Sequence, residues 1–379
     1  MFAALVLITQ ANLDAQIDRA RLKATVEKLA SWHDRNTNNP TLTEAADWLA
    51  SELKKIPGLQ VETMKYGVKK GARIKEDKEV VQVVATLPGE DDRRILVGGH
   101  FDTINMVPRD LETSLQSRAP GANDDSSGTS LTLELARVMA TRKWKHTLVF
   151  IAFSGEEQGL LGSAALARRA KEEGWKIDAL LNNDIVGNSG NKLGQKENKL
   201  VRVFSDESDK HQSRELARFI AYAARAKDFG VKLVYRKDRF GRGGDHTSFN
   251  NEGFTAVRFT EVFEEFSRQH TAEDLPSGVD FDYLRHVAQV NLRAASQLAD
   301  AGEQPTTVRI DRRQGYDTRI TWKSTAETTY TIYWRDTASS VWQRHKDIGP
   351  VSEFTVKGIN KDDHIFAVGA KGGIPVEAK

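Results

Sequence analysis

Short apolar runs alternate with amphipathic segments along the first three hundred residues. One run, LVFIAF at residues 148–153, ends at Ser154-Gly155 and is followed by two carboxylates, Glu156 and Glu157. A short apolar run bounded by a glycine is typical of a buried strand in a parallel sheet. Ligands of open α/β sheets bind beyond the carboxyl ends of the strands. The pattern therefore places Glu156 and Glu157 where a functional site is expected, although an isolated Glu-Glu pair is usually a solvated turn.

Helical and strand-like patterns then follow one another in order. Apolar residues at helical spacing predict helices, and Thr43 is expected to cap the second of them. The predicted helices cover residues 15–32, 44–55, 129–142, 162–173, 214–226 and 280–301. The predicted strands cover residues 61–66, 79–87, 94–100, 148–153, 177–182, 201–204, 231–235 and 256–260. This alternation predicts an α/β fold, with a mostly parallel twisted sheet sandwiched by helices. Residues 102–121 are expected to be irregular.

The pattern changes after the linker at residues 302–305. Short alternating runs separated by turn residues, such as YTIYWR at residues 330–335, predict a small C-terminal β-sandwich. This segment resembles a fibronectin type III domain, with Trp322 as the buried strand tryptophan. His364 stands where those domains usually carry a corner tyrosine.

The amino-terminal residues form a unit of their own. Residues 2–8 (FAALVLI) precede Thr9-Gln10-Ala11, and this resembles the end of a secretory signal. We therefore expect residues 1–11 to be a signal-peptide remnant, 12–304 the main domain and 305–379 the sandwich, in a secreted or periplasmic protein. The alternative is an N-terminal strand or helical turn packed on the body. Because the apolar runs fall short of the ~18 residues of a membrane span, no integral membrane segment is expected.

Composition narrows the chemistry. Lys plus Arg is 55 and Asp plus Glu is 53, a net charge of +2 that favours neither nucleic acid nor an anionic membrane as a partner. The chain has no cysteine. This excludes disulfides, a thiol nucleophile and thiolate metal ligands, so any metal must be held by His, Asp and Glu.

The first candidate ligand ends the strand predicted at residues 94–100. His100 and Asp102 are two residues apart, so their side chains point to the same side of an extended segment. Asp102 can then accept the second ring N–H of His100 and orient the imidazole toward a metal. A surface histidine near a turn aspartate is the alternative for this pair alone.

Three further segments carry candidate ligands. Asp124 and Asp125 lie in a turn, and a carboxylate there can bridge two cations or cap the following helix. Asp184 follows the buried strand predicted at 177–182 and needs a metal or backbone N–H groups as its partner. His270 lies in a loop after the last strand of the sheet. Its side chain could be a metal ligand or could cap the next turn.

The candidates form a coherent donor set. They supply two imidazoles and three carboxylates: His100, Asp124, Glu157, Asp184 and His270. Such nitrogen and oxygen donors without sulfur suit a zinc-type dinuclear site with positions open to water. Glu156 is then the spare carboxylate, placed to accept a proton from a metal-bound water.

The ordered motifs resemble a known family. The series H-x-D, P-G-A-x-D-D-x-S-G, S-G-E-E-x-G-L-x-G-S, N-x-D-x-x-G and H-T-x-E-D is similar to that of the co-catalytic zinc aminopeptidases of the bacterial leucyl/aminoacyl type. Their superfamily includes glutamate carboxypeptidase II, glutaminyl cyclases and the transferrin receptor ectodomain. The resemblance spans residues 95–301 and implies the zinc exopeptidase fold with two Zn²⁺ ions per chain.

The resemblance also implies how the metals are held. His100 and Asp184 would hold one zinc ion. Glu157 and His270 would hold the other, and Asp124 would bridge the two ions.

The remaining catalytic roles follow from the same resemblance. Glu156 would be the general base for a water that bridges the metals, and Asp102 the carboxylate behind His100. The peptide between Asp124 and Asp125 would be cis, and Asp125 would support the ligands beside it.

Two positions depart from the family pattern. Gln269 stands where a tyrosine often contacts the oxyanion, and an amide N–H could make the same contact. Asp245-His246 matches a family S-D-H segment with Gly244 in place of the serine. We expect Asp245 and His246 to form part of the wall of the site rather than to bind metal.

The resemblance predicts a dizinc aminopeptidase that removes the first residue of peptides with a free N-terminus. Two alternatives stay open. One is a metal-free binding or adhesion ectodomain on the same fold. The other is an aminoacyl cyclotransferase. No partner of the C-terminal domain can be assigned from its sequence.

Overall fold

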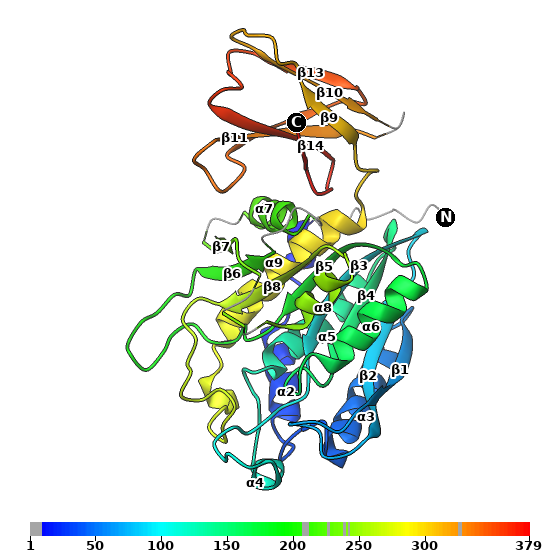
Figure 1. Cartoon of the computed structure of the whole chain (residues 1–379), viewed down its shortest axis with the longest axis vertical. Helices are drawn as coiled ribbons and strands as arrows, with labels where there is room; N and C mark the ends of the chain where they lie inside the picture. Colours follow the sequence, from blue (N-terminus) through cyan, green and yellow to red (C-terminus); the bar gives the residue numbers. More distant parts are fainter. Residues whose placement is uncertain (1–9, 207–211, 226–227, 238–239, 242, 325–327) are drawn as a thin grey trace, which may run out of the picture.

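The structure is a computed structural model that describes residues 10–206, 212–225, 228–237, 240–241, 243–324 and 328–379. These residues form an α/β body and a smaller β-sheet lobe that follows it in the chain (Figure 1). Most of the predicted signal remnant, residues 1–9, lies outside the described part. No helix within the described ranges is long and apolar enough to cross a membrane.

Eight described strands form the sheet of the body. They are β1 (Gln60–Val68), β2 (Lys78–Leu87), β3 (Asp91–His100), β4 (His146–Phe153), β5 (Lys176–Asn183), β6 (Leu200–Ser205), β7 (Gly230–Val234) and β8 (Ala256–Glu261). Their order across the sheet is β1-β2-β4-β3-β5-β8-β6-β7. The four central strands, β4, β3, β5 and β8, are parallel to one another. The predicted fold class is confirmed, with antiparallel pairs at β1–β2, β2–β4 and β6–β8.

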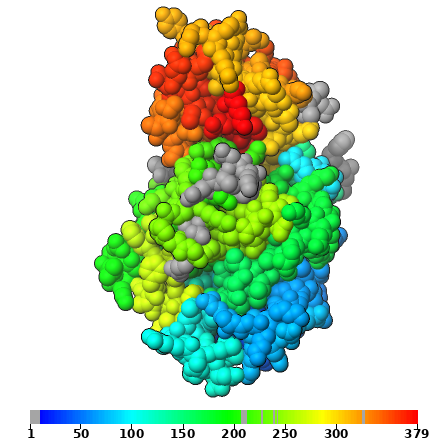
Figure 2. All heavy atoms as spheres, viewed as in Figure 1, coloured from blue at the N-terminus to red at the C-terminus, as the bar shows by residue number. Residues whose placement is uncertain are grey.

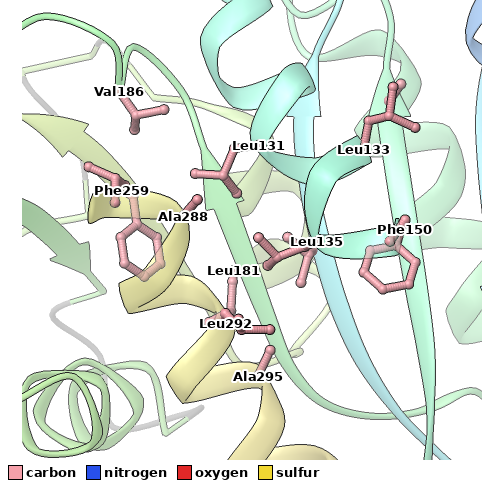
Figure 3. Close-up of a cluster of buried hydrophobic side chains, with 14 of the residues drawn as sticks. Leu131, Leu133, Leu135, Phe150, Leu181, Val186, Phe259, Ala288, Leu292 and Ala295 are labelled. Carbon is pink, nitrogen blue, oxygen red and sulfur yellow. The ribbon is translucent and has the colours of Figure 1, made fainter. Parts of the chain in front are cut away.

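Helices cover both faces of this sheet. They are α1 (Gln10–Asp14), α2 (Arg19–Leu29), α3 (Pro40–Lys54), α4 (Leu111–Gln116), α5 (Ser126–Met139), α6 (Leu161–Glu172), α7 (Ser213–Ala223), α8 (Asp245–Asn251) and α9 (Phe281–Ala299). A short 3₁₀ helix spans Pro276–Gly278. The alternating side chains of β4 show the two faces. Phe150 packs in the cluster with α5 and α9 (Figure 3), whereas Ile151 packs in the cluster with α6 and α8.

Several predicted boundaries were wrong. The helix expected to begin after Thr43 begins at Pro40, with Asn39 as its N-cap. Proline suits the first position of a helix because its φ is already fixed and no N–H is left unpaired. The segment expected to be irregular contains α4, whose N-cap Asp110 accepts the N–H of Thr113 at 2.9 Å. The short helix α8 had not been predicted at all.

The carboxyl-terminal lobe consists of two antiparallel sheets. One has the order β13-β10-β9 and the other β12-β11-β14-β15. The strands are β9 (Thr306–Ile310), β10 (Thr318–Lys323), β11 (Tyr330–Asp336), β12 (Arg344–Ile348), β13 (Glu353–Val356), β14 (His364–Ala370) and β15 (Val376–Glu377). Trp322 is buried between the sheets, with its ring 5.5 Å from that of Tyr330.

The lobe contacts α7 and other parts of the body. The rings of Tyr222 on α7 and Tyr333 on β11 meet edge to face, with centroids 5.1 Å apart, and Ile374 packs in the main core cluster. Figure 1 places this lobe at the opposite end of the body from α4, and Figure 2 shows it as a distinct mass at that end.

Candidate metal centre

Three adjacent parallel strands deliver side chains to one edge of the sheet. His100 is the last residue of β3, which lies between β4 and β5. Glu157 follows β4 and Asp184 follows β5. Because parallel strands end at the same edge, residues far apart in the chain become neighbours there.

The other two candidate ligands come from loops. Asp124 directly precedes Asp125, the N-cap of α5, and the peptide bond between them is cis, as the resemblance implied. His270 lies in the loop after β8 with a φ of 55°. Both loops bring their side chains over the ends of the central strands.

The five candidates form two groups that share Asp124. His100 Nε2 lies 3.1 Å from Asp124 Oδ1 and 3.8 Å from Asp184 Oδ1. On the other side, His270 Nε2 lies 3.0 Å from Asp124 Oδ2 and 3.2 Å from Glu157 Oε2. Within each group the donor atoms lie within 4.8 Å of one another. The two oxygens of Asp124 thus face different imidazoles.

The chemistry of these donors fits zinc. All three carboxylates and His100 are buried, and carboxylates without compensating charge are costly to bury. Glu157 Oε1 is buried without a hydrogen-bond partner among the described residues. Imidazole and carboxylate donors in groups of three, without sulfur, match the ligands of a zinc ion with an open position.

Asp102 links His100 to the pair of glutamates. His100 Nδ1 lies 3.2 Å from the backbone oxygen of Asp102 and 3.5 Å from its carboxylate. The same carboxylate accepts the backbone N–H groups of Glu156 and Glu157, both at 3.2 Å. Asp102 therefore orients the imidazole and also fixes the turn that carries the glutamates.

Asp125 joins the ends of three segments. Its carboxylate accepts N–H groups from His100 at 3.1 Å, Gly128 at 2.9 Å and Ile185 at 3.1 Å. The side chain thus ties β3, α5 and the residue after Asp184 to one another, in addition to capping the helix.

Glu156 lies in the same cavity beside these groups. Burial raises the pKa of its carboxyl well above the usual range, and the nearby carboxylates of Asp184 and Glu157 raise it further, whereas His100 lowers it. The cavity has a volume of about 610 Å³ and is also lined by Arg73, Met106 and Leu160. A larger cavity, of about 920 Å³, lies between the end of α9 and the lobe, and no candidate ligand lines it.

The three remaining candidates lie near the centre but outside both groups. Asp245 is buried at the start of α8, where burial raises its pKa to about 7. His246 is buried with Nε2 2.9 Å from the backbone oxygen of Lys237, and burial lowers its pKa to about 4. Gln269 donates its side-chain N–H to Glu264 at 3.2 Å.

Two buried arginines at the site had not been predicted. Arg35 donates to the backbone oxygens of Phe101 at 2.6 Å and Pro120 at 2.7 Å, so it holds the segment that follows His100 and the loop that carries Asp124. Burial lowers its pKa to about 10. Arg258 on β8 lies 2.8 Å from Asp184 Oδ1. The sequence offered no signal for either, because each contact joins distant segments.

Asp274 is another residue missed from the sequence. Its carboxylate accepts the backbone N–H groups of Asn123 at 3.0 Å and Asp124 at 2.9 Å. Asp274 is the last residue of the H-T-x-E-D motif. The motif alone does not indicate that this aspartate holds the turn that carries Asp124.

Known proteins resemble this chain in sequence. The sequence pattern of peptidase family M28 matches residues 82–295. A probable zinc metalloprotease of Pyricularia oryzae is 37% identical, covering 94% of this chain and 80% of that protein. A probable zinc metalloprotease of Leptosphaeria maculans is 35% identical, covering 94% of this chain and 92% of that protein.

Solved structures share the fold of the body. The LapA aminopeptidase of Legionella pneumophila matches with a TM-score of 0.60 at 23% identity, covering 80% of this chain and 79% of that chain. An aminopeptidase from Aneurinibacillus sp. strain AM-1 matches with a TM-score of 0.60 at 18% identity, covering 78% and 97%. These likenesses show the fold alone. The family pattern spans more than half of the chain, and relatives above 30% identity extend along most of its length, so the chain belongs to peptidase family M28.

Proposed function

We propose that this chain is a dizinc aminopeptidase. The observation that carries the proposal is the position of Asp124, whose two carboxylate oxygens face His100 and His270 respectively. A carboxylate in this position suits two cations that share one ligand. The names of the relatives, probable zinc metalloproteases and aminopeptidases, support the same assignment.

Each zinc ion would have its own pair of residues. His100 and Asp184 would hold one, Glu157 and His270 the other, and Asp124 would bridge them. Bound zinc lowers the pKa of water and polarises a carbonyl group, which is the chemistry that peptide hydrolysis requires.

Glu156 is the proposed general base. It lies in the cavity outside the two groups that share Asp124, and its carboxylate comes within 4.8 Å of donor atoms of His100 and Glu157. Its carboxylate would accept a proton from the attacking water and return it to the amine that leaves. Asp102 would keep the His100 ring oriented through these steps.

Peptides with a free N-terminus are the proposed substrates, with the amine docked beside the carboxylates of the cavity. We assign this activity to residues 12–304. Residues 305–379 are proposed to be a fibronectin type III-like domain, for which the three- and four-stranded antiparallel sheets are the support. Its partner is left unassigned.

The test is hydrolysis of aminoacyl p-nitroanilides by the full chain. Wild type is compared with wild type plus a chelator and with Glu156→Gln, and zinc per chain is measured. We expect about two zinc ions, with activity abolished by the chelator and by the substitution. Equal rates in all three samples would reject the mechanism. Reproducible absence of metal binding would favour a binding module, and cyclisation of glutaminyl peptides without hydrolysis would favour a cyclotransferase.

A further inference from the structure

A basic loop joins β1 and β2 and reaches the mouth of the metal cavity. Two of its lysines are paired with acids: Lys69 with Asp77 at 2.7 Å and Lys75 with Glu112 at 2.8 Å. Arg73 is different. It is exposed, it lines the metal cavity, and no carboxylate of the described residues lies within ion-pair distance of its guanidinium.

The side chain of Arg73 is nevertheless fixed in place. Its Nη1 donates to the backbone oxygen of Glu157 at 2.5 Å, one residue from the proposed general base. A hydrogen bond to a backbone oxygen neutralises no charge, so the cation is positioned but not paired. The remaining N–H groups of the planar guanidinium can still form a two-pronged contact with a carboxylate.

The backbone around Arg73 is anchored as well. Asn38 donates its side-chain N–H to the backbone oxygen of Arg73 at 2.9 Å and accepts the N–H of Lys75 at 2.8 Å. Ile74, between Arg73 and Lys75 in the chain, is buried in the main hydrophobic core. These contacts fix the backbone at Arg73 and at the two residues that follow it. A preorganised cation loses less entropy on binding than a mobile surface arginine.

The charge of the cavity favours an anion at this place. Four carboxylates line it, from Asp124, Glu156, Glu157 and Asp184. Two divalent cations would balance these carboxylates, and Arg73 and Arg258 would then leave the cavity cationic. Arg258 is already paired with Asp184. Of the arginines that line this cavity within the described residues, Arg73 is therefore the one available to a ligand.

We propose that Arg73 binds a carboxylate of the peptide substrate, so that peptides with a carboxylate close to the scissile bond are preferred. This inference rests on the proposed peptidase function and adds its substrate class. The carboxylate has two possible sources: the side chain of an acidic N-terminal residue, or the C-terminal carboxylate of a dipeptide. Either would meet the same guanidinium.

Matched substrate pairs separate the two sources. Glutamyl and glutaminyl p-nitroanilides differ only in the side-chain carboxylate, and leucylglycine and leucylglycinamide differ only in the C-terminal one. With zinc-loaded full-length protein, we expect Arg73→Gln to lower kcat/KM for the charged member of one pair by about 10- to 100-fold, mainly through KM. Both members lose the hydrogen bond to the backbone oxygen of Glu157 in this variant, so the ratio of kcat/KM between the charged and the neutral member isolates the carboxylate contact.

Two further variants control for charge and folding. Arg73→Lys keeps the charge without the two-pronged geometry and should give an intermediate loss. Arg109→Gln removes another exposed arginine, one that does not line the cavity, and should leave the charged-to-neutral ratio of kcat/KM unchanged in both pairs. If Arg73→Gln changes charged and neutral substrates equally in both pairs, the inference is wrong.

Failure of the proposed function would be seen separately. If wild type hydrolyses none of the four substrates, the peptidase assignment fails. Calorimetric binding of glutamate α-amide and glutamine α-amide then tests Arg73 without catalysis. Tighter binding of the charged amide to wild type, lost in Arg73→Gln, would support the carboxylate contact, and equal binding of both amides to both proteins would overturn it.

Discussion

Arg258 holds Asp184 from the neighbouring strand, with Nη2 2.8 Å from Oδ1 and both side chains buried. Burial alone would raise the pKa of Asp184, but Arg258 and His100 outweigh it, and the net shift is downward. A candidate zinc ligand is therefore kept ionised before any metal binds. Arg258 and His100 both face Oδ1 of Asp184, at 2.8 and 3.8 Å respectively.

Removing this arginine should affect the metal-free protein most. Arg258→Met would leave a buried carboxylate without its partner, and breaking a buried pair in this way costs about 3–5 kcal/mol. Zinc can replace the lost cation, so the loss should be smaller in the zinc-loaded protein. The measurement is chemical denaturation with and without zinc. The control is Arg319→Met, whose pair with Glu353 is exposed and should cost at most about 1 kcal/mol. Equal losses with and without zinc would contradict the expectation.

His246 predicts how stability changes in acid. Its pKa is about 4 in the folded protein because the ring is buried, whereas an unfolded histidine titrates near 6.5. The unfolded state therefore binds the proton first as pH falls. The contribution of a neutral His246 is fully present above about pH 6.5 and is lost progressively toward pH 4, by about 3 kcal/mol in total.

The test compares unfolding free energies at pH 7.5 and pH 4.5 for wild type and His246→Gln. The drop between the two pH values should be smaller in the variant, since glutamine has no proton to bind. The exposed His345 provides a matched control: His345→Gln should reproduce the drop of wild type. If the unfolding free energy falls by the same amount in all three proteins, protonation of His246 does not contribute to the loss of stability in acid.

Arg35 should matter for both stability and zinc binding. Arg35→Met would leave the backbone oxygens of Phe101 and Pro120 buried without their donor, and each unpaired group costs about 1–3 kcal/mol. We expect lower unfolding free energy and weaker zinc binding, because the loops with His100 and Asp124 lose a common anchor. Arg21→Met, which removes a half-exposed arginine on α2, is the comparison for nonspecific destabilisation. Unchanged zinc affinity at pH 7 in folded Arg35→Met would contradict the positioning role.

Deleting residues 306–379 should leave hydrolysis of small substrates nearly unchanged. The lobe contacts α7 and lies at the opposite end of the body from α4 (Figure 1). The deletion exposes Tyr222, so Tyr222→Ser is included to preserve solubility. Circular dichroism checks that the body remains folded. Complete loss of activity in a folded truncated chain would show that the lobe contributes to the site.

The strands that carry the site could be predicted because each has a strong local signal. All residues of β4 are buried. Its continuous apolar run indicates a buried strand, and the Ser154-Gly155 pair that follows indicates where the strand ends. Asp184 and His100 likewise follow or end apolar runs. Local patterns therefore located the strand ends, and the resemblance added which residues would meet there.

Other features depend on contacts that local patterns do not contain. Arg35 reaches carbonyl groups 66 and 85 residues away in the chain, and Arg258 reaches Asp184 from a separate strand. The helix α8 is seven residues long, too short for helical periodicity to stand out. The start of α3 at Pro40 falls at the end of NTNNP, residues 36–40, which contains no apolar periodicity to mark a helix.

The anchoring of Arg35 makes the amino-terminal segment part of the active unit. The region that matches the family pattern, residues 82–295, contains all five candidate ligands but excludes Arg35, Asn38 and Arg73. A recombinant fragment trimmed to that region would keep every metal donor yet lose the guanidinium that clamps two of the donor-bearing loops. The smallest autonomous catalytic fragment must therefore begin upstream of Arg35, well outside the span by which the family is recognised.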